Sequence, residues 1–346
     1  MQKLLIIGAT GVIGKRIVKL ADGLLPQVEI IKACRKIPKQ DSSFRQVDIF
    51  NQRSLEKALS DINVVINTVG PFEYNPELLL NACFKANCHY IDIAETENFI
   101  AKVEKTALAN KNSNSFVITG CSTVPALIET IAQSWKEEKD LAEIRVFLSM
   151  GSNNSVSPTL IYSLLRPLGK IDKNNRKYFS QAIKKTFPKV GKRLYGNYPS
   201  IFEHTGIKIN NQQIPARFYV SFDKVIYSHL LFLASKILPK IPDNLLFNLS
   251  KIANLFTPII KFIGSPVGIL LIETLDKKQT ILDNIEIRAD SNGLNIPALP
   301  SVWTAKKLLE NNLFFPTKIL SLSDLFSPKE IFELLKKEGY KVYGAT

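Results

Sequence analysis

The chain has 346 residues, enough for two domains that each bury a core of their own. A composition of 45% hydrophobic and 22% charged residues excludes an intrinsically disordered chain. The net charge of +14 is concentrated in residues 166–193, where ten Lys or Arg, Lys173 among them, stand against the single acid Asp172. Such a local cluster indicates one anionic partner surface.

Short apolar runs alternate with helical patterns through the first 120 residues. The runs lack polar alternation, as is typical of a parallel sheet covered by helices on both faces. We expect strands at 4–8, 28–34, near 45–50, 64–68, 90–93 and 116–119, and helices at 11–20, 54–59, 76–86 and 98–111. This order predicts a Rossmann domain, a doubly wound parallel α/β fold, over residues 1–139.

Strand patterns with polar alternation follow residue 135 and predict a second, mixed α/β domain over residues 140–297. Its sheet should be largely antiparallel. We expect its strands at 143–150 and 214–222, with a hairpin of 268–275 and 281–289. Helical patterns at 302–310 and 328–338 are expected to return to the first domain, so that residues 298–346 complete it.

Two segments are candidates for a surface role. The basic segment 166–193 is either a solvated helix face or a docking surface for anionic lipid headgroups or an acidic carrier protein. In the apolar segment 225–273, charged residues leave runs shorter than the ~20 residues that span a bilayer. It is either a helix pair that caps the second domain or forms a homodimer contact, or a basic amphipathic element on a membrane or around an acyl chain.

Three glycines, Gly8, Gly11 and Gly14, stand between the first strand and the first helix. In the dinucleotide fingerprint they permit a tight turn, a close approach to the diphosphate and close helix packing. Amides at the helix N-terminus then bind the phosphates. The predicted diphosphate site comprises Gly8, Ala9, Thr10, Gly11, Val12, Ile13 and Gly14.

The second strand runs into Arg35 and Lys36, with no acid at its end. A cation there suits a 2′-phosphate, whereas NAD sites carry an acid, so NADP(H) is favoured over NAD(H). Asp48 is either a contact to the adenine edge or a turn former. Four residues after the fourth strand complete the predicted cofactor site: Asn67, Thr68, Gly70 and Pro71.

Candidate catalytic residues follow the fifth and sixth strands. Asp92 and Glu95 are candidates for orienting a substrate amine or for acid–base work, and Ser122 is a third candidate. Candidate substrate-binding residues are Tyr74, Arg166, Arg217 and Arg288, since arginines bind carboxylates. No metal site is predicted, because no second ligand pair accompanies the cysteines and histidine at 83, 88 and 89.

Five stretches, GATGVIGKRIV, ACRK, VINTVGPF, ACFKANCHYIDIAE and GCSTVPAL, resemble in order and separation the NADP-binding domain of the saccharopine dehydrogenase family. The later stretches NIPALPSVWTAKKLL and DLFSPKEIFELLKKEGY resemble the C-terminal pattern of uncharacterised bacterial members. The resemblance implies a Rossmann domain, a second α/β domain and a nicotinamide-dependent redox step between them. Many members carry an Asp where this chain has Ser122, so the role of that Asp does not transfer.

The resemblance leaves the substrate open, because some members make or break a secondary amine through an imine and a relative reduces an acyl double bond. We expect an NADP-dependent oxidoreductase acting on a C=N substrate, with an acyl or lipid C=C or C=O substrate as the alternative. A membrane-associated NADP-binding scaffold or sensor is the non-enzymatic alternative. A short-chain dehydrogenase is excluded because no Tyr-x-x-x-Lys pair is present, and no nucleic-acid module is recognisable. A cytoplasmic homodimer is expected, in solution or peripheral on the inner face of a membrane.

Overall fold

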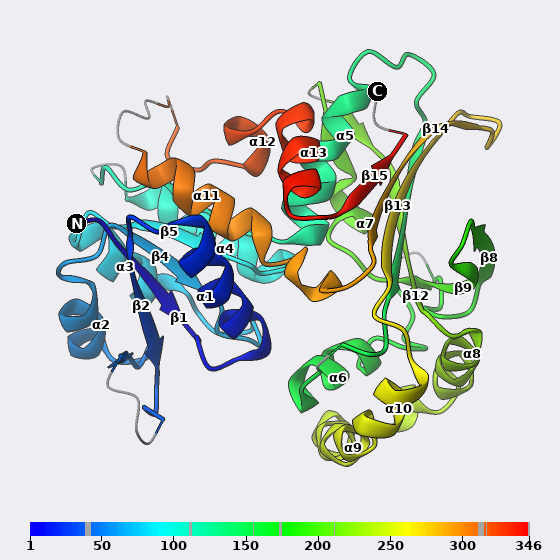
Figure 1. Ribbon diagram of the computed structural model, residues 1–346, viewed down its shortest axis with the longest axis horizontal. Coiled ribbons are helices and arrows are strands. Elements are labelled where there is room, and N and C mark those ends of the chain that lie inside the picture. Colours follow the sequence, from blue (N-terminus) through cyan, green and yellow to red (C-terminus); the bar gives the residue numbers. More distant parts are fainter. Residues whose placement is uncertain are drawn as a thin grey trace. The chain divides into compact units, whose positions relative to one another are not determined.

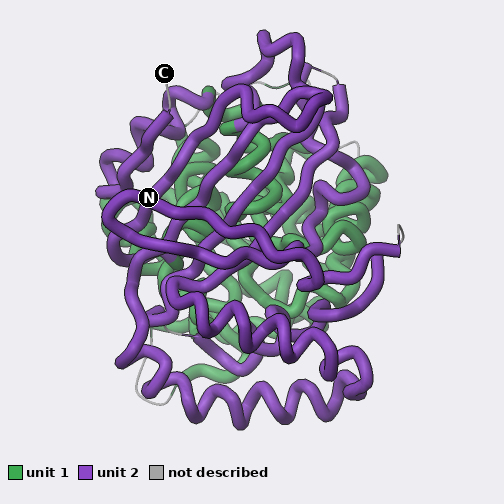
Figure 2. Tube along the Cα trace, turned by 90° about the vertical axis from the view of Figure 1, so that its right-hand side faces the viewer, with its two compact units in different colours: residues 1–131, 294–327 green, residues 132–293, 328–346 purple. Residues whose placement is uncertain are grey.

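The protein divides into two units, which Figure 2 distinguishes by colour. The computed structural model describes residues 1–38, 43–110, 113–154, 156–172, 175–210, 212–310, 315 and 317–344. Unit 1 comprises residues 1–131 and 294–327, and unit 2 comprises residues 132–293 and 328–346.

Unit 1 is built on a six-stranded parallel sheet with the order β3-β2-β1-β4-β5-β6. The strands are β1 (Lys3–Ile7), β2 (Glu29–Cys34), β3 (Phe44–Gln46), β4 (Val64–Asn67), β5 (His89–Asp92) and β6 (Val117–Ile118). This strand order is that of the dinucleotide-binding fold, and it confirms the predicted doubly wound domain.

Helices cover both faces of this sheet (Figure 1). On one face α1 (Val12–Leu24) packs against α11 (Leu299–Leu309). On the other lie α2 (Gln52–Leu59), α3 (Glu77–Lys85) and α4 (Glu97–Ala109), whose apolar side chains form one core with Leu5 and Ile7. The remaining helices of unit 1 are the π-helix η1 (Thr123–Leu127), α5 (Ile128–Ala132), η4 (Gly293–Asn295) and α12 (Leu322–Leu325).

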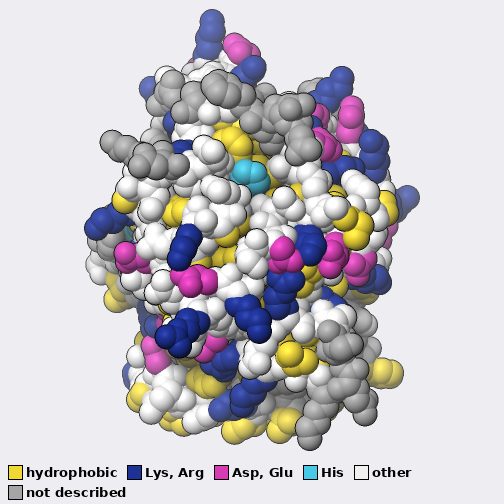
Figure 3. Space-filling model, turned by 90° about the vertical axis from the view of Figure 1, so that its left-hand side faces the viewer, with side chains coloured by type: hydrophobic (Ala, Val, Ile, Leu, Met, Phe, Trp, Pro, Cys, Tyr) yellow, Lys and Arg dark blue, Asp and Glu magenta, His cyan; other side chains and the backbone are white. Residues whose placement is uncertain are grey.

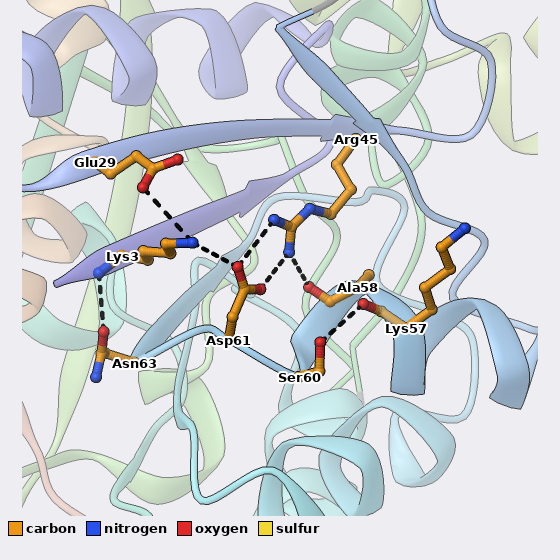
Figure 4. A network of polar contacts seen from close by, with 8 residues as sticks. All are labelled: Lys3, Glu29, Arg45, Lys57, Ala58, Ser60, Asp61 and Asn63. Carbon is orange, nitrogen blue, oxygen red and sulfur yellow. Dashed lines mark hydrogen bonds and ion pairs between the residues drawn. The ribbon is translucent and has the colours of Figure 1, made fainter. Parts of the chain in front are cut away.

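An ion-pair network ties together the amino ends of three strands (Figure 4). Asp61 accepts from Lys3 Nζ at 2.6 Å and from Arg45 Nη1 at 2.8 Å, which lowers the pKa of its carboxyl. Lys3 also contacts Glu29, at 3.7 Å. The network lies at the amino edge of the sheet and leaves the opposite, carboxyl edge for ligands.

Unit 2 is built on a seven-stranded mixed sheet with the order β15-β14-β13-β7-β12-β9-β8. Its strands are β7 (Glu143–Met150), β8 (Ala182–Phe187), β9 (Gly191–Tyr198), β12 (Ala216–Phe222), β13 (Gly268–Leu275), β14 (Ile281–Ala289) and β15 (Lys341–Tyr343). Only the pairing of β7 with β12 is parallel, which confirms the largely antiparallel sheet. A separate hairpin pairs β10 (Ile207–Ile209) with β11 (Gln212–Ile214).

The chain end corrects one expectation. Residues 328–346 were expected to complete the first domain, but they belong to unit 2, whereas residues 294–327 belong to unit 1. The reason is β15, which pairs with β14 at the edge of the second sheet and keeps α13 (Pro328–Lys337) with it.

The other helices of unit 2 are short. They are η2 (Gln133–Trp135), α6 (Pro158–Leu165), α7 (Phe202–Thr205), α8 (Val225–Ala234), η3 (Leu238–Lys240), α9 (Asp243–Leu255) and α10 (Thr257–Ile263). No helix in the described part of the chain is by itself long and apolar enough to cross a membrane. Only α9 and α10 taken together, with a bend of 52° between them, meet the requirement of length and composition.

The basic segment 166–193 is not a helix face. Its second half forms the hairpin of β8 and β9, so that interpretation was wrong. Many of its cations have partners inside unit 2: Lys185 bonds to Glu273, and Arg176 pairs with Asp172 at 2.7 Å. Lys173 lies outside the described residues. Figure 3 draws a different side of the molecule, on which Lys and Arg side chains are likewise interspersed with acidic ones.

Candidate functional site

The carboxyl edge of the unit 1 sheet gathers most of the predicted site residues. All six strands are parallel, so the turns after β1, β2, β4, β5 and β6 lie at one edge. In open α/β sheets ligands bind at this edge, where the strand order reverses. Here the reversal falls between β1 and β4, which pair directly.

The turn after β1 and the first turn of α1 each have one position with room only for glycine. Gly8 has φ +86°, and a Cβ there would lie 2.6 Å from Thr68 Oγ1. A Cβ on Gly14 would overlap the carbonyl oxygen of Gly8. The N–H groups of Gly8 and Ala9 both donate to the carbonyl of Ala33, at 3.0 and 3.1 Å. The turn is therefore held close to both β2 and β4.

The N-terminus of α1 has no side-chain cap within the described residues. Gly11 is its N-cap and provides no side-chain hydrogen bond, and the first turn contains no acid. The amides of Val12, Ile13 and Gly14 belong to this first turn and sit at the positive end of the helix dipole. Together with the glycine turn they fit a dinucleotide diphosphate.

Arg35 and Lys36 directly follow β2, and both are exposed. No acidic partner contacts either side chain within the residues that the structure describes. Gln46 Nε2 donates to the carbonyl of Arg35 at 3.1 Å, and Cys34 Sγ donates to that of Lys36 at 3.1 Å. The backbone is thus fixed while both cations are available, which fits a 2′-phosphate.

Asp48 forms a turn. Its Oδ1 accepts from the N–H of Phe50 at 3.0 Å, and its own N–H donates to Ser54 Oγ at 3.0 Å. Of the two interpretations, the turn former is therefore observed. The contact to adenine remains a prediction.

Asn67, at the end of β4, is fully buried and organises the loop that follows. Its Nδ2 donates to the hydroxyls of Tyr74 at 2.8 Å and Tyr90 at 2.9 Å, and its Oδ1 accepts from the N–H of Val69 at 3.1 Å. The loop continues through the cis peptide bond between Gly70 and Pro71. Burial raises the pKa of Tyr74. Tyr74, predicted as a substrate contact, thus supports the loop, and sequence reasoning missed this cluster.

Asp92 connects the ends of β5 and β6. Its Oδ1 accepts from the N–H groups of Ala94 at 2.9 Å and Gly120 at 3.0 Å. Its Oδ2 is buried and accepts no hydrogen bond from the described residues. Burial raises the pKa of this carboxyl to about 6, although the two N–H donors and the neighbouring hydroxyls of Thr119 and Tyr90 oppose the shift. The hydrogen bonds of Asp92 thus join the loops after β5 and β6, and burial makes its carboxyl easier to protonate than an exposed one.

Glu95 and Ser122 form a pair that neither motif predicted by itself. Ser122 is buried, and its Oγ donates to Glu95 Oε1 at 2.8 Å. The Glu95 residue is accessible to solvent, but surrounding protein atoms desolvate its carboxyl and raise its pKa; the bond from Ser122 opposes this. The three candidate catalytic residues thus follow the adjacent strands β5 and β6. The sequence had placed them after the fifth and sixth strands.

The three candidate arginines of unit 2 each contact an acid. Arg166 Nη2 lies 3.2 Å from Asp243, and Arg217 Nε lies 3.4 Å from Glu143. Arg288 is buried, and its Nε donates to Glu286 at 2.8 Å. They lie after α6, in β12 and in β14, and no described contact joins them. The structure does not assemble them into one carboxylate site.

The similarity to a known protein family falls within unit 1. Residues 4–117 match the family model of the saccharopine dehydrogenase NADP-binding domain. The matched residues lie in unit 1 and are similar to the NADP-binding domain of saccharopine dehydrogenases. The resemblance and the NADP cofactor expected from the sequence are therefore confirmed, while the role of each residue in binding stays a prediction.

One curated relative of this domain carries an oxidoreductase name. A probable mitochondrial saccharopine dehydrogenase-like oxidoreductase of Arabidopsis thaliana is 23% identical over 125 residues, which are 35% of this chain. The match spans only 28% of that relative's length.

Two solved structures are similar over nearly the whole chain. Apo saccharopine dehydrogenase (L-Glu forming) from Saccharomyces cerevisiae has a TM-score of 0.64 at 13% identity and 99% coverage of both chains. An engineered D-amino acid dehydrogenase bound to NADP+ has a TM-score of 0.50 at 12% identity and 95% coverage of both. At these identities the likeness concerns the fold.

Proposed function

We propose that the protein is an NADP-dependent oxidoreductase that transfers hydride to or from the carbon of a C=N bond in an imine or amino acid. One observation carries the proposal: an acid–hydroxyl pair, Glu95 and Ser122, lies at the sheet edge where the glycine turn fits a dinucleotide. Hydride transfer to an imine carbon needs a proton for the nitrogen, and a carboxyl of raised pKa is a suitable donor.

Each residue has a defined part in this proposal. The α1 amides hold the diphosphate, Arg35 and Lys36 hold the 2′-phosphate, and Asn67 keeps the loop after β4 in place. Bound NADPH would supply the hydride. Glu95 holds a proton at its carboxyl and gives it to the substrate nitrogen, and Ser122 Oγ then stabilises the carboxylate that forms. In the reverse direction Glu95 receives the proton.

A second candidate is reduction of an acyl or lipid C=C or C=O bond. It is favoured by the contacts of Arg166, Arg217 and Arg288, since a substrate carboxylate would have to compete with an acid at each of them. The exposed apolar helices of unit 2 would suit an acyl substrate better. Both candidates use the same cofactor site and the same proton donor.

The cofactor assignment is tested by titrating the protein with NADPH and NADH. We expect NADPH to bind at least about tenfold tighter, because a charge-assisted bond contributes about 1.5–3 kcal/mol. Arg35→Ala should remove most of the preference. Lys19→Ala, which removes an exposed charge from α1, should leave it unchanged. Equal affinities in the wild type would refute the assignment.

The reaction is tested by NADPH oxidation with oxo-acid and amine pairs alongside enoyl thioesters. Turnover of the first set, lost in Glu95→Gln, is the expected result. Turnover of the thioesters alone would select the second candidate. No turnover with either, despite tight NADPH binding, would refute the oxidoreductase and favour a scaffold or sensor.

A further inference from the structure

The helices of residues 226–263 expose an unusual number of apolar side chains. Of the 21 large hydrophobic residues that are exposed within the described chain, 12 lie in this stretch, and the side chain of Phe262 is 92% exposed. We call these the apolar helical face: Ile226, Leu230, Leu233, Ile237, Leu245, Leu249, Ile252, Leu255, Phe256, Ile259, Phe262 and Ile263. A surface this rich in Ile, Leu and Phe indicates an interaction site.

The outward direction of these side chains is set by what the helices bury. In α8, Ser228 and Leu231 are buried where the helix packs on β9 and β12. In α9, Leu246 and Ser250 are buried where the helix packs on α6. In α8 and α9 the exposed apolar residues recur at helical spacing on the side opposite these buried residues, so each of the two helices presents an apolar stripe to solvent.

The third helix is held by hydrogen bonds to its backbone. Asn153 Nδ2 donates to the carbonyl of Lys261 at 3.0 Å. Tyr227, from α8, donates to the carbonyl of Ile260 at 3.5 Å. The exposed Phe262 therefore belongs to an anchored helix, α10.

Positive charge accompanies the apolar face. Residues 224–263 contain five lysines and one acid, Asp243. That acid is already bound by Arg166 at 3.2 Å and Lys170 at 3.6 Å. The lysines are Lys224, Lys236, Lys240, Lys251 and Lys261. Anionic headgroups complement this charge, whereas a second copy would bring like charges together.

The helices are too short to span a bilayer separately. At ~1.5 Å per residue, the 13 residues of α9 reach about 20 Å, less than the ~30 Å hydrocarbon core. A bend of 52° separates α9 from α10. Short amphipathic helices with lysines beside an apolar stripe lie in the plane of the membrane interface.

We propose that α8, α9 and α10 dock unit 2 on the surface of an anionic lipid bilayer. Ile, Leu and Phe of the apolar helical face enter the headgroup–acyl boundary. The five lysines contact lipid phosphates. The docking requires neither NADPH nor turnover, so it can fail while the proposed function stands.

The test is co-sedimentation of the full chain with vesicles of phosphatidylcholine, with and without about one-third phosphatidylglycerol. We expect at least about tenfold stronger binding to the anionic vesicles at low salt, and loss of most of that gain at about 0.5 M salt. The double variant Leu255→Ser/Phe262→Ser should weaken binding at least about tenfold, because it removes two apolar side chains that the bilayer would bury. Leu108→Ser, at a residue 65% exposed on α4, is the matched control and should bind as the wild type does.

The contribution of charge is tested with the double variant Lys236→Glu/Lys251→Glu, which should lose the preference for anionic vesicles. The matched control is Lys102→Glu/Lys105→Glu on α4, which should keep the preference. Unchanged NADPH affinity shows that each variant is folded. The proposal is overturned if the wild type does not sediment with anionic vesicles, or if Leu108→Ser loses as much binding as the double variant. It is also overturned if light scattering shows a dimer that Leu255→Ser/Phe262→Ser converts to a monomer, because the face then serves a second copy.

Discussion

Replacing Asp92 by asparagine should remove a pH dependence from the stability of unit 1. The side-chain amide keeps an Oδ1 acceptor for the N–H groups of Ala94 and Gly120. It puts a neutral group in place of the buried Oδ2, which accepts no hydrogen bond from the described residues. Asparagine thus resembles the protonated acid and cannot ionise.

The magnitude follows from the pKa of Asp92, which burial raises from 3.8 to about 6. Because the pKa in the folded state exceeds that in the unfolded chain, the protonated acid stabilises the fold fully below pH ~4. That contribution is lost as the pH rises through 6. A difference of about 2 units corresponds to about 3 kcal/mol. Above pH 7, Asp92→Asn should therefore be more stable than the wild type by up to this amount.

The assay is urea unfolding of both proteins between about pH 4.5 and 8, with a carbon-13 NMR titration of the Asp92 carboxyl. The wild type should lose free energy of unfolding relative to Asp92→Asn as the pH rises. Asp22→Asn, an exposed acid on α1, is the control and should follow the wild type. Parallel curves for wild type and Asp92→Asn, or a titration midpoint below pH 4.5, would refute the reasoning.

Two further predictions concern the cofactor turn and the proton donor. Gly14→Val should lower NADPH affinity at least about tenfold, because a Cβ there overlaps the carbonyl of Gly8. The control is Gly23→Ala in the same helix, where a Cβ meets no atom within 4 Å. It should keep the NADPH affinity and raise the free energy of unfolding by about 0.5–1 kcal/mol. Equal losses of affinity in both variants would contradict the steric argument. Ser122→Ala removes the donor to Glu95, so the pKa of Glu95 should rise further and the limb of the pH–rate profile that it controls should move to higher pH. Ser122→Thr keeps the hydroxyl and should restore the profile; an unchanged profile in Ser122→Ala would exclude Glu95 as the titrating group.

The apolar runs of the first 120 residues predicted the strands of unit 1 well. A strand that is buried on both faces is apolar at nearly every position, and this pattern is visible in the sequence of the strand alone. The glycine turn was predictable from its spacing between a strand and a helix, and the steric demand on Gly14 is local, since its Cβ would meet the carbonyl oxygen of Gly8. The demand on Gly8 comes from Thr68, which is distant in the sequence. Arg35 and Lys36 do follow the end of β2, as predicted, whereas their contact to a 2′-phosphate stays a prediction.

The basic segment shows where the local patterns were misread. Residues 182–187 alternate between more and less exposed positions, as a strand does, yet the density of lysines suggested a helix face. The cations also have partners far away in the sequence, as in Lys185 with Glu273. Net charge counted along the chain therefore overstated the free charge.

The sequence by itself determined the parallel fold of unit 1, the glycine turn before α1 and the short length of the apolar runs in residues 225–273. Each depends on neighbours in the chain, through steric fit, strand burial or helical spacing. Only the tertiary structure decided that β15 joins the second sheet, that Ser122 meets Glu95, and that Arg217 is already engaged by an acid. These are contacts between residues far apart in the sequence. They form only after folding has brought the strands and loops that carry them side by side, so no local pattern predicts them.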